Sequence, residues 1–205
     1  MKEKCNIAIF DAEFTAVSDK YRGIQEMIQC ALYVHEASLS DNGTLIISKH
    51  PICELKKYVK PMYTRELTEY IMDLTGISQE MVDNGDPFKS TMDDIFNIIK
   101  LHDVKKIFTW GPDKYTIKAN CTMTGYDKKR AETVSDLIFD VSVIISEMFG
   151  YDTAISQHKV CEILNVKEVG EMHDAKSDAK NLCNLIREVV ERDNRKDKIF
   201  LRLLF

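Results

Sequence analysis

The fold of this chain is decided by residues 6–15, which read Asn6-Ile7-Ala8-Ile9-Phe10-Asp11-Ala12-Glu13-Phe14-Thr15. The apolar run 6–10 predicts a buried β-strand, and two carboxylates follow at its end. Because side chains alternate along a strand, Asp11 and Glu13 point to one face of the sheet, while Ala12 and Phe14 point to the other. Carboxylates aimed at one spot repel each other unless a shared proton or a divalent cation relieves the repulsion. The stretch therefore predicts either a cation site or a solvated strand end that enters a turn.

The composition is that of a globular protein. The chain has 205 residues, of which 44% are hydrophobic and 30% charged, and these proportions lie well outside the disordered range. This length suffices for one well-cored domain, so we expect a single domain over residues 1–205. Six cysteines without a CxxC pair indicate free thiols. His158 and Cys161 have the spacing of half a zinc site, but without a second half we expect Cys161 to pack in a helical core.

The charge and the amino-terminal residues restrict the class of function. The first apolar stretch is interrupted by Asp11 and Glu13, so it is too short for a signal-peptide core or a membrane span. We therefore expect a cytoplasmic protein with no membrane partner. The formal net charge of −5 argues against a protein that coats DNA through a basic face. It allows a nucleic-acid enzyme, because cations bound by carboxylates can bring phosphate to an acidic site.

Strand patterns dominate the first sixty residues. Three β-rich stretches cover residues 4–10, 26–36 and 44–59. The tripeptide Asp41-Asn42-Gly43 lies between the second and the third, and an Asn-Gly pair with flanking alternation is a strong hairpin signal. These stretches predict an antiparallel meander of three strands, which ends at Pro61.

Helical spacing begins after the meander and then alternates with strands. Apolar residues recur at three and four positions from Thr64 to Gly76, and a second amphipathic run covers 88–101. Residues 106–110 and 137–141 predict two further buried strands, each followed by helical sequence. Three strands followed by alternating strands and helices indicate an α/β domain with a mixed sheet.

Histidine and aspartate residues precede the last long helix. Apolar residues at helical spacing from Ala175 to Val189 predict this helix, and Asp174 is suited to cap its N-terminus. His173 lies just outside the cap and Asp178 lies in the first turns, so the intervening loop can return the imidazole to the side of the carboxylate. The simpler interpretation is a capped, solvated helix end without chemistry.

A further carboxylate stands at a junction between a strand and a helix. In Trp110-Gly111-Pro112-Asp113, the proline suits the first helical position and places Asp113 near the positive end of the helix. Electrostatic stabilisation of the helix end is the simpler role for this carboxylate. The alternative is that it joins the acids at the end of the first strand.

The order and spacing of these residues resemble a known family. The DEDDh 3'-5' exonucleases of the RNase H-like superfamily have the motifs DxExT, an Asp after a strand, and Hx4D. Their counterparts here are 11–15, Asp113, and His173 with Asp178, and residues 74–77 match the family's LTGI signature. Trp-Gly before Asp113 and HDAxxDA at 173–179 are most similar to the branch of Eri-type exoribonucleases and bacterial KapD-like proteins, although only Pro112 stands where that branch usually has two residues.

The resemblance covers about residues 5–190 and leaves 191–205 as a C-terminal extension. It implies an RNase H-like mixed five-stranded sheet, with an antiparallel meander of three strands and two strands parallel to the first, flanked by helices. It also implies a metal-dependent exonuclease that hydrolyses the 3' ends of single-stranded RNA or DNA to nucleoside 5'-monophosphates. Two divalent cations, Mg²⁺ or Mn²⁺, would be bound by four carboxylates, Asp11, Glu13, Asp113 and Asp178. His173 would accept the proton of the attacking water.

The resemblance further implies contacts to the terminal nucleotide from Phe14, Thr15 and the backbone near Ala12. Phe14 either stacks on a base or packs in the core. The basic run 128–130 either meets backbone phosphates or is solvated surface. The apolar tail 199–205 either packs on its own domain or forms a homodimer contact. The alternative function is a nuclease-fold nucleic-acid-binding or regulatory protein that keeps the cleft without turnover.

Overall fold

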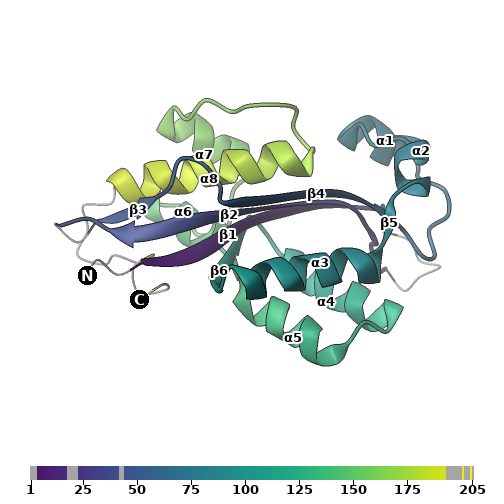
Figure 1. The fold of residues 1–205 in the computed structure, drawn as a ribbon. Helices are drawn as coiled ribbons and strands as arrows, with labels where there is room; N and C mark the ends of the chain where they lie inside the picture. Colours follow the sequence, from purple (N-terminus) through teal and green to yellow (C-terminus); the bar gives the residue numbers. More distant parts are fainter. Residues whose placement is uncertain (1–3, 18–22, 42–43, 193–199, 201–203, 205) are drawn as a thin grey trace.

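The computed structural model describes residues 4–17, 23–41, 44–192, 200 and 204. They form one mixed sheet with helices on both faces (Figure 1). The order of strands is β5-β4-β2-β1-β6-β7, and the short β3 pairs with β2. The strands are β1 Lys4–Phe14, β2 Met27–Leu39, β3 Leu45–Ile47, β4 Cys53–Lys60, β5 Asp86–Pro87, β6 Val104–Thr109 and β7 Ile138–Asp140.

The sheet confirms the expected antiparallel meander and the two strands parallel to the first, but in the described residues it has seven strands and not five, because the short β3 and β5 join it. Strand β2 pairs antiparallel with both β1 and β4, whereas β6 runs parallel to β1 and β7 runs parallel to β6. The predicted third strand, 44–59, is wrong as one element because it forms both β3 and β4. Pro51 lies between them and has no N–H to donate to a ladder. Pairing with β2 resumes at the next residue, where the Ile52 N–H donates to the Val34 carbonyl at 2.8 Å.

Helices α6, α7 and α8 lie on one face of the sheet and α3, α4 and α5 on the other, while α1 and α2 lie at one end (Figure 1). The helices are α1 Glu69–Thr75, α2 Gln79–Asp83, α3 Phe88–Leu101, α4 Asp113–Thr124, α5 Lys128–Leu137, α6 Ser142–Met148, α7 Gln157–Leu164 and α8 Ala175–Arg192. The predicted run 88–101 coincides with α3. The helix predicted from Thr64 begins later, at Glu69, because the Thr68 hydroxyl caps it by accepting the Ile71 N–H at 3.3 Å.

The alternation of β1 divides the core into two layers. Ile7 and Ile9 are fully buried in the layer beneath α8, whereas Ala8 and Phe10 belong to the layer that α3 covers. Asp11 and Glu13 continue the α8 face by the same alternation. The two carboxylates therefore emerge on the sheet beside the beginning of α8, where the helical cover ends.

The described residues of the C-terminal tail pack on their own domain. Phe200 is buried against Phe108, with the two rings edge to face and their centroids 5.6 Å apart, and Leu204 packs on the same core. The other tail residues and the predicted turn residues Asn42 and Gly43 lie outside the described residues. All six cysteines are free, and Cys161 is buried. Within the described part of the chain, no helix has the length and apolar character needed to cross a membrane.

Candidate active site

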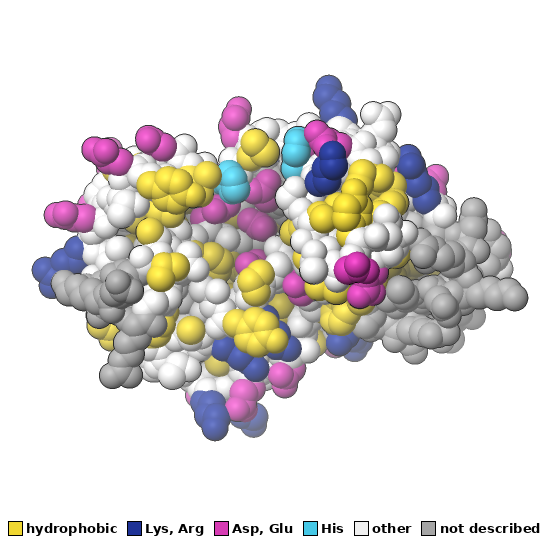
Figure 2. Space-filling model, turned by 180° about the vertical axis from the view of Figure 1, so that it is seen from behind, with side chains coloured by type: hydrophobic (Ala, Val, Ile, Leu, Met, Phe, Trp, Pro, Cys, Tyr) yellow, Lys and Arg dark blue, Asp and Glu magenta, His cyan; other side chains and the backbone are white. Residues whose placement is uncertain are grey.

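A cavity of about 470 Å³ lies where the end of β1 meets the beginnings of α4, α7 and α8. It is lined by Asp11, Ala12, Glu13, Trp110, Asp113, Ser156, Gln157, His158, Glu168, Met172, His173 and Asp178. Figure 2 shows it as an acidic hollow with histidine side chains on both sides. The structure thus brings together all five residues predicted to carry the chemistry, although they come from three distant segments of the chain.

Strand geometry positions the first two carboxylates. β1 continues to Phe14, so Asp11 and Glu13 lie within the strand, opposite Ala31 and Gln29 of β2. The register shifts between Glu13 and Phe14, because Phe14 pairs with Met27 and leaves Ile28 of β2 as an extra residue in the partner strand. Such an extra residue bends the strand that contains it, here β2 beside Glu13. Pairing then continues, since the Thr15 N–H donates to the Glu26 carbonyl at 2.8 Å.

The turn between β6 and α4 brings Asp113 into the cavity. Gly111 has a φ of 107°, a conformation that favours glycine, and its N–H donates to the Asp140 carboxylate at 2.9 Å. The same carboxylate oxygen accepts the Ser142 N–H at 2.8 Å. The indole N–H of Trp110 donates to the Ile155 carbonyl at 3.2 Å. These bonds hold the short turn, and Asp113 lines the cavity although the motif is one residue shorter than in the similar branch.

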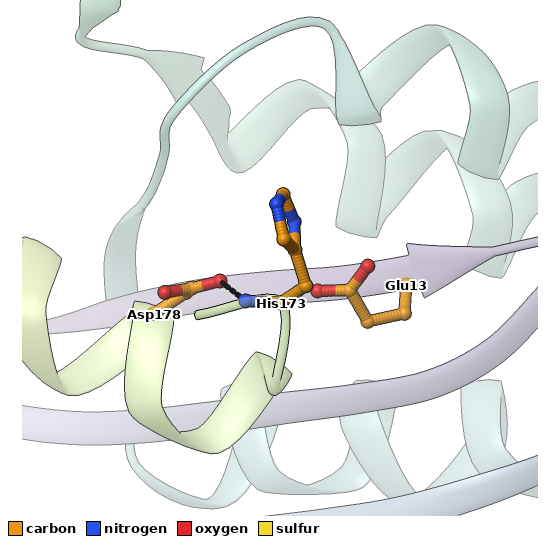
Figure 3. A group of neighbouring side chains, drawn as sticks. All are labelled: Glu13, His173 and Asp178. Carbon is orange, nitrogen blue, oxygen red and sulfur yellow. Dashed lines mark hydrogen bonds between the residues drawn. The ribbon is translucent and has the colours of Figure 1, made fainter. Parts of the chain in front are cut away.

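The third motif approaches Glu13 through an unusual backbone conformation (Figure 3). His173 has a φ of 61°, and its backbone N–H donates to the Asp178 carboxylate at 2.9 Å. One possible ligand atom each from Glu13, His173 and Asp178 lies within 4.8 Å of the others. The loop before α8 therefore returns the histidine to the side of the carboxylates, as its position outside the helix cap predicted.

Two contacts anchor the start of α8 to the sheet. The Ala175 N–H donates to the buried Gln29 side chain at 2.7 Å, and Lys56 of β4 forms an ion pair with Asp174 at 2.7 Å. Asp174 also accepts the Ser177 N–H at 3.3 Å, as expected of a capping residue. Because Gln29 lies opposite Glu13 in the sheet, the first and third motifs are held together through β2.

Burial and mutual repulsion raise the pKa values of the cluster. Burial raises the pKa of Asp11 well above its usual range, and the charges of Asp113 and Glu13 raise it further. Burial, followed by the charge of Asp178, raises the pKa of Glu13 to about 8. The pKa of Asp113 rises to about 7, mainly through burial, and burial also raises that of Asp178. Without a cation, the site retains protons at neutral pH.

The donor set fits a hard divalent cation. Carboxylate oxygens are the ligands that Mg²⁺ and Mn²⁺ prefer, and four carboxylates from the motifs share this cavity. One oxygen of Asp113, Oδ2, is buried and has no hydrogen-bond partner. A buried acceptor without a partner is costly. A bound cation would satisfy that oxygen and remove the repulsion that raises the pKa values.

Of the three residues expected to contact the nucleotide, Ala12 lines the cavity. Phe14 is half-buried and packs with the core layer on the α3 side. Thr15 is buried, and its hydroxyl accepts the Glu26 N–H at 3.0 Å. The structure gives these last two side chains packing and hydrogen-bonding roles, and their contact with a nucleotide stays a prediction.

Sequence reasoning did not select the α7 side of the cavity. Ser156, Gln157 and His158 line it from the first turn of α7, and Glu168 and Met172 line it from the loop before α8. The signal for that turn was Ser156, whose hydroxyl caps the helix by accepting the Lys159 N–H at 3.2 Å. His158 forms an ion pair with Glu168, and Cys161 is buried in the core as expected.

Comparison with models of known protein families places the chain in one of them. The family model described as exonuclease, of the RNase T type, matches residues 8–186. The chain belongs to this exonuclease family. A sequence search of curated proteins gave no significant match.

Solved exonuclease structures share the fold. A 3'-exonuclease that recognises the histone mRNA stem-loop is 16% identical, with a TM-score of 0.72 over 92% of this chain and 64% of that one. The nuclease domain of 3'hExo, a DEDDh family member bound to rAMP, is 18% identical, with a TM-score of 0.71 over 92% of both chains. Pop2p of S. pombe, in a form with bound Mg²⁺ and Mn²⁺, is 15% identical, with a TM-score of 0.64 over 91% of this chain and 83% of that one. The chain thus spans 64% and 60% of the length of two 3'-exonuclease chains that it matches. Sequence identities of 16% and 18% to them do not separate the branches of the family.

Proposed function

We propose that this protein is a metal-dependent exonuclease that shortens single-stranded RNA or DNA from the 3' end and releases nucleoside 5'-monophosphates. The observation that carries the proposal is the single cavity in which the residues of all three motifs meet. Membership of the exonuclease family supports it. Within that family, Trp110-Gly111 before Asp113 and the HDAxxDA sequence at 173–179 favour the Eri-type and KapD-like branch, whose motifs they resemble.

The carboxylates supply the metal sites in this mechanism. Asp11, Glu13, Asp113 and Asp178 would hold two divalent cations, which when bound stabilise charge on the attacking and leaving oxygens of the phosphodiester. The unpartnered Oδ2 of Asp113 and the raised pKa values of the cluster support this assignment. The bond from the His173 N–H to Asp178 leaves the second oxygen of Asp178 for a cation.

His173 is the proposed general base. Its side chain is exposed on the cavity wall, and its backbone is fixed by the hydrogen bond to Asp178. An exposed imidazole can accept a proton from a water beside the scissile phosphate and then release it to solvent. The left-handed conformation of His173 directs the loop towards the acids, at the cost of local backbone strain.

The alternative is a binding or regulatory protein without turnover, which a second motif too short to reach the cavity and an unpacked apolar tail would favour. Asp113 lines the cavity despite the shortening, and Phe200 is buried on its own domain. Neither feature therefore favours the alternative over catalysis.

The test is a nuclease assay with Mn²⁺ and 5'-labelled single-stranded RNA and DNA of one sequence. We expect a ladder that shortens from the 3' end, with nucleoside 5'-monophosphates as the released products. Asp113→Asn should be inactive, and His173→Ala should lose about 10²–10⁴-fold in rate. Glu66→Gln, which changes an exposed carboxylate outside the cavity, is the matched control and should keep full activity. Absence of shortening, or equal rates for Asp113→Asn and the wild type, would refute the proposal.

A further inference from the structure

The cavity has few groups that can attract a phosphate. Five of its lining residues are acids, Glu168 being the one outside the motifs. None of the described lining residues is lysine or arginine, so His158 and His173 are the only side chains there that can carry positive charge. Figure 2 shows histidine side chains on both sides of the acidic hollow. Because His173 must be neutral to accept a proton, His158 is the one described lining side chain that can supply a lasting positive charge beside the proposed cations.

Two carboxylates orient the His158 ring. Its Nδ1 lies 2.5 Å from Glu168 Oε2, and its Nε2 lies 3.4 Å from Glu162 Oε1, one helical turn further along α7. The first is a short charged contact, and the second is too long for a strong hydrogen bond. Half of the His158 side chain, 51%, is exposed. The pKa of His158 is raised, mainly by its bond to Glu168, so the ring stays charged to a higher pH than free imidazole.

The Nε2 atom of His158 can exchange its partner at little cost. Glu162 has a better partner in Lys159, whose ammonium lies 2.9 Å from its Oε2. If Nε2 turned to another acceptor, Glu162 would therefore keep an ion pair, and Nδ1 would stay on Glu168. His158 also lies in the first turn of α7, where the helix dipole favours an anion.

The carboxylate that orients His158 is itself fixed in place. Glu168 precedes Val169, and the buried Asn181 of α8 holds Val169 through two bonds. Asn181 accepts the Val169 N–H at 2.8 Å and donates to the Val169 carbonyl at 3.2 Å. The position of the His158 ring is thus determined by α7 on one side and by a loop pinned to α8 on the other.

We propose that His158 is a substrate-binding residue of the exonuclease, whose imidazolium, oriented by Glu168, donates from Nε2 to a phosphate oxygen of the strand held in the cavity. This inference rests on the proposed function, because it assumes that a nucleic-acid strand enters the cavity. It assigns a different task to each histidine, with His158 binding phosphate and His173 accepting a proton.

The test compares His158→Gln with His158→Lys. We expect His158→Gln to raise KM by about 10-fold, since a charged hydrogen bond is lost, and to leave kcat within about 2-fold. For His158→Gln, the slope of log affinity against log salt concentration should become shallower by about 0.7. This is the change expected when one phosphate contact to a single strand is lost. His158→Lys should restore the wild-type slope. His50→Gln, which removes an exposed histidine outside the cavity, is the matched control and should leave the slope unchanged.

Affinity is measured by fluorescence anisotropy in Mn²⁺ with an oligonucleotide whose 3'-terminal linkages are phosphorothioates, so that binding is recorded with little turnover. An unchanged slope in His158→Gln, or failure of lysine to restore it, would overturn the inference and leave His158 as a structural latch for the loop. An inactive wild type that binds with a His158-dependent slope would refute catalysis but keep the role of His158. The two failures are therefore distinguishable.

Discussion

Replacing Glu13 by glutamine is expected to stabilise the metal-free protein at pH 8, although Glu13 belongs to the proposed catalytic cluster. The carboxylate is largely buried, and the charges of Asp178 and Asp113 face it. Glutamine has nearly the same shape but carries no charge, so it removes both the desolvation of the anion and the repulsion. The same change should weaken the response of the protein to Mn²⁺, because a ligand has been lost.

The magnitude follows from the pKa of Glu13. A pKa of about 8 in place of 4.5 means that the ionised Glu13 carboxylate destabilises the folded protein by about 5 kcal/mol at pH values above 8. The glutamine side chain still buries a polar amide, and in the wild type the neighbouring acids can take up a proton and so reduce the repulsion. We therefore expect Glu13→Gln to gain about 2 kcal/mol of the roughly 5 kcal/mol. For a protein of this size, that gain corresponds to a rise in Tm of about 4–8 °C.

The pH dependence has a definite sign. Because the folded-state pKa of Glu13 lies above the unfolded value, the folded state binds more protons between about pH 4.5 and pH 8. The metal-free wild type should therefore lose stability as pH rises through this window. Buried His35 acts in the opposite direction below pH 6.5, because burial lowers its pKa to about 4 and the unfolded chain takes up the proton there. Measurements between pH 6.5 and pH 8.5 separate the two effects.

The assay is calorimetric unfolding in EDTA and in Mn²⁺ for the wild type, Glu13→Gln and the control Glu66→Gln. In EDTA at pH 8, Glu13→Gln should have the highest Tm of the three, and its Tm should depend less on pH than that of the wild type. Mn²⁺ should raise the Tm of the wild type and of the control more than that of Glu13→Gln. A lower Tm for Glu13→Gln in EDTA would show that the carboxylates do not repel each other in the folded protein.

Three further substitutions test how the site is held. Asp140→Ala removes the acceptor of two backbone N–H groups and should cost about 2–3 kcal/mol of stability. Because the turn that carries Asp113 is released, calorimetric titration should also show weaker Mn²⁺ binding, and unchanged binding would contradict this. Asn181→Ala breaks both bonds to the loop that carries Glu168, so steady-state kinetics should show a rise in KM because His158 is no longer oriented, whereas an unchanged KM would mean that the loop holds itself. Gly170→Ala would place a Cβ 2.1 Å from the Ser177 hydroxyl oxygen at a φ of 76°, so thermal unfolding should show a loss of more than about 1 kcal/mol; a wild-type Tm would refute the clash.

Local patterns in the sequence predicted the parts of the fold that depend on neighbouring residues. The alternation of residues 6–14 placed Asp11 and Glu13 on one face, and the structure has this arrangement. The helix 88–101 and the strands near 106–110 and 137–141 follow from periodicity, with ends that differ by a few residues. The break at Pro51 was missed, because alternation on both sides of a proline looks like one strand until the missing N–H is considered.

The α7 side of the cavity could not be predicted in this way. His158 and Glu168 are ten residues apart, and their meeting depends on how α7 and the loop before α8 pack on the sheet. The link from Gln29 to Ala175 spans most of the chain and depends on the register of β2 against β1. Such contacts arise from tertiary packing, which a local pattern does not encode.

The position of the acids on the central strand explains how the fold tolerates them. β1 is paired on both sides, with β2 and with β6, and residues 7–10 are buried on both faces. This anchoring lets the end of the strand hold Asp11 and Glu13 together although their raised pKa values show that each charge is unfavourable there. The repulsion cannot be relieved by moving the strand, so it is relieved by protons or by cations. A site built in this way should bind divalent metal more tightly as pH rises, because fewer protons then compete for the same oxygens.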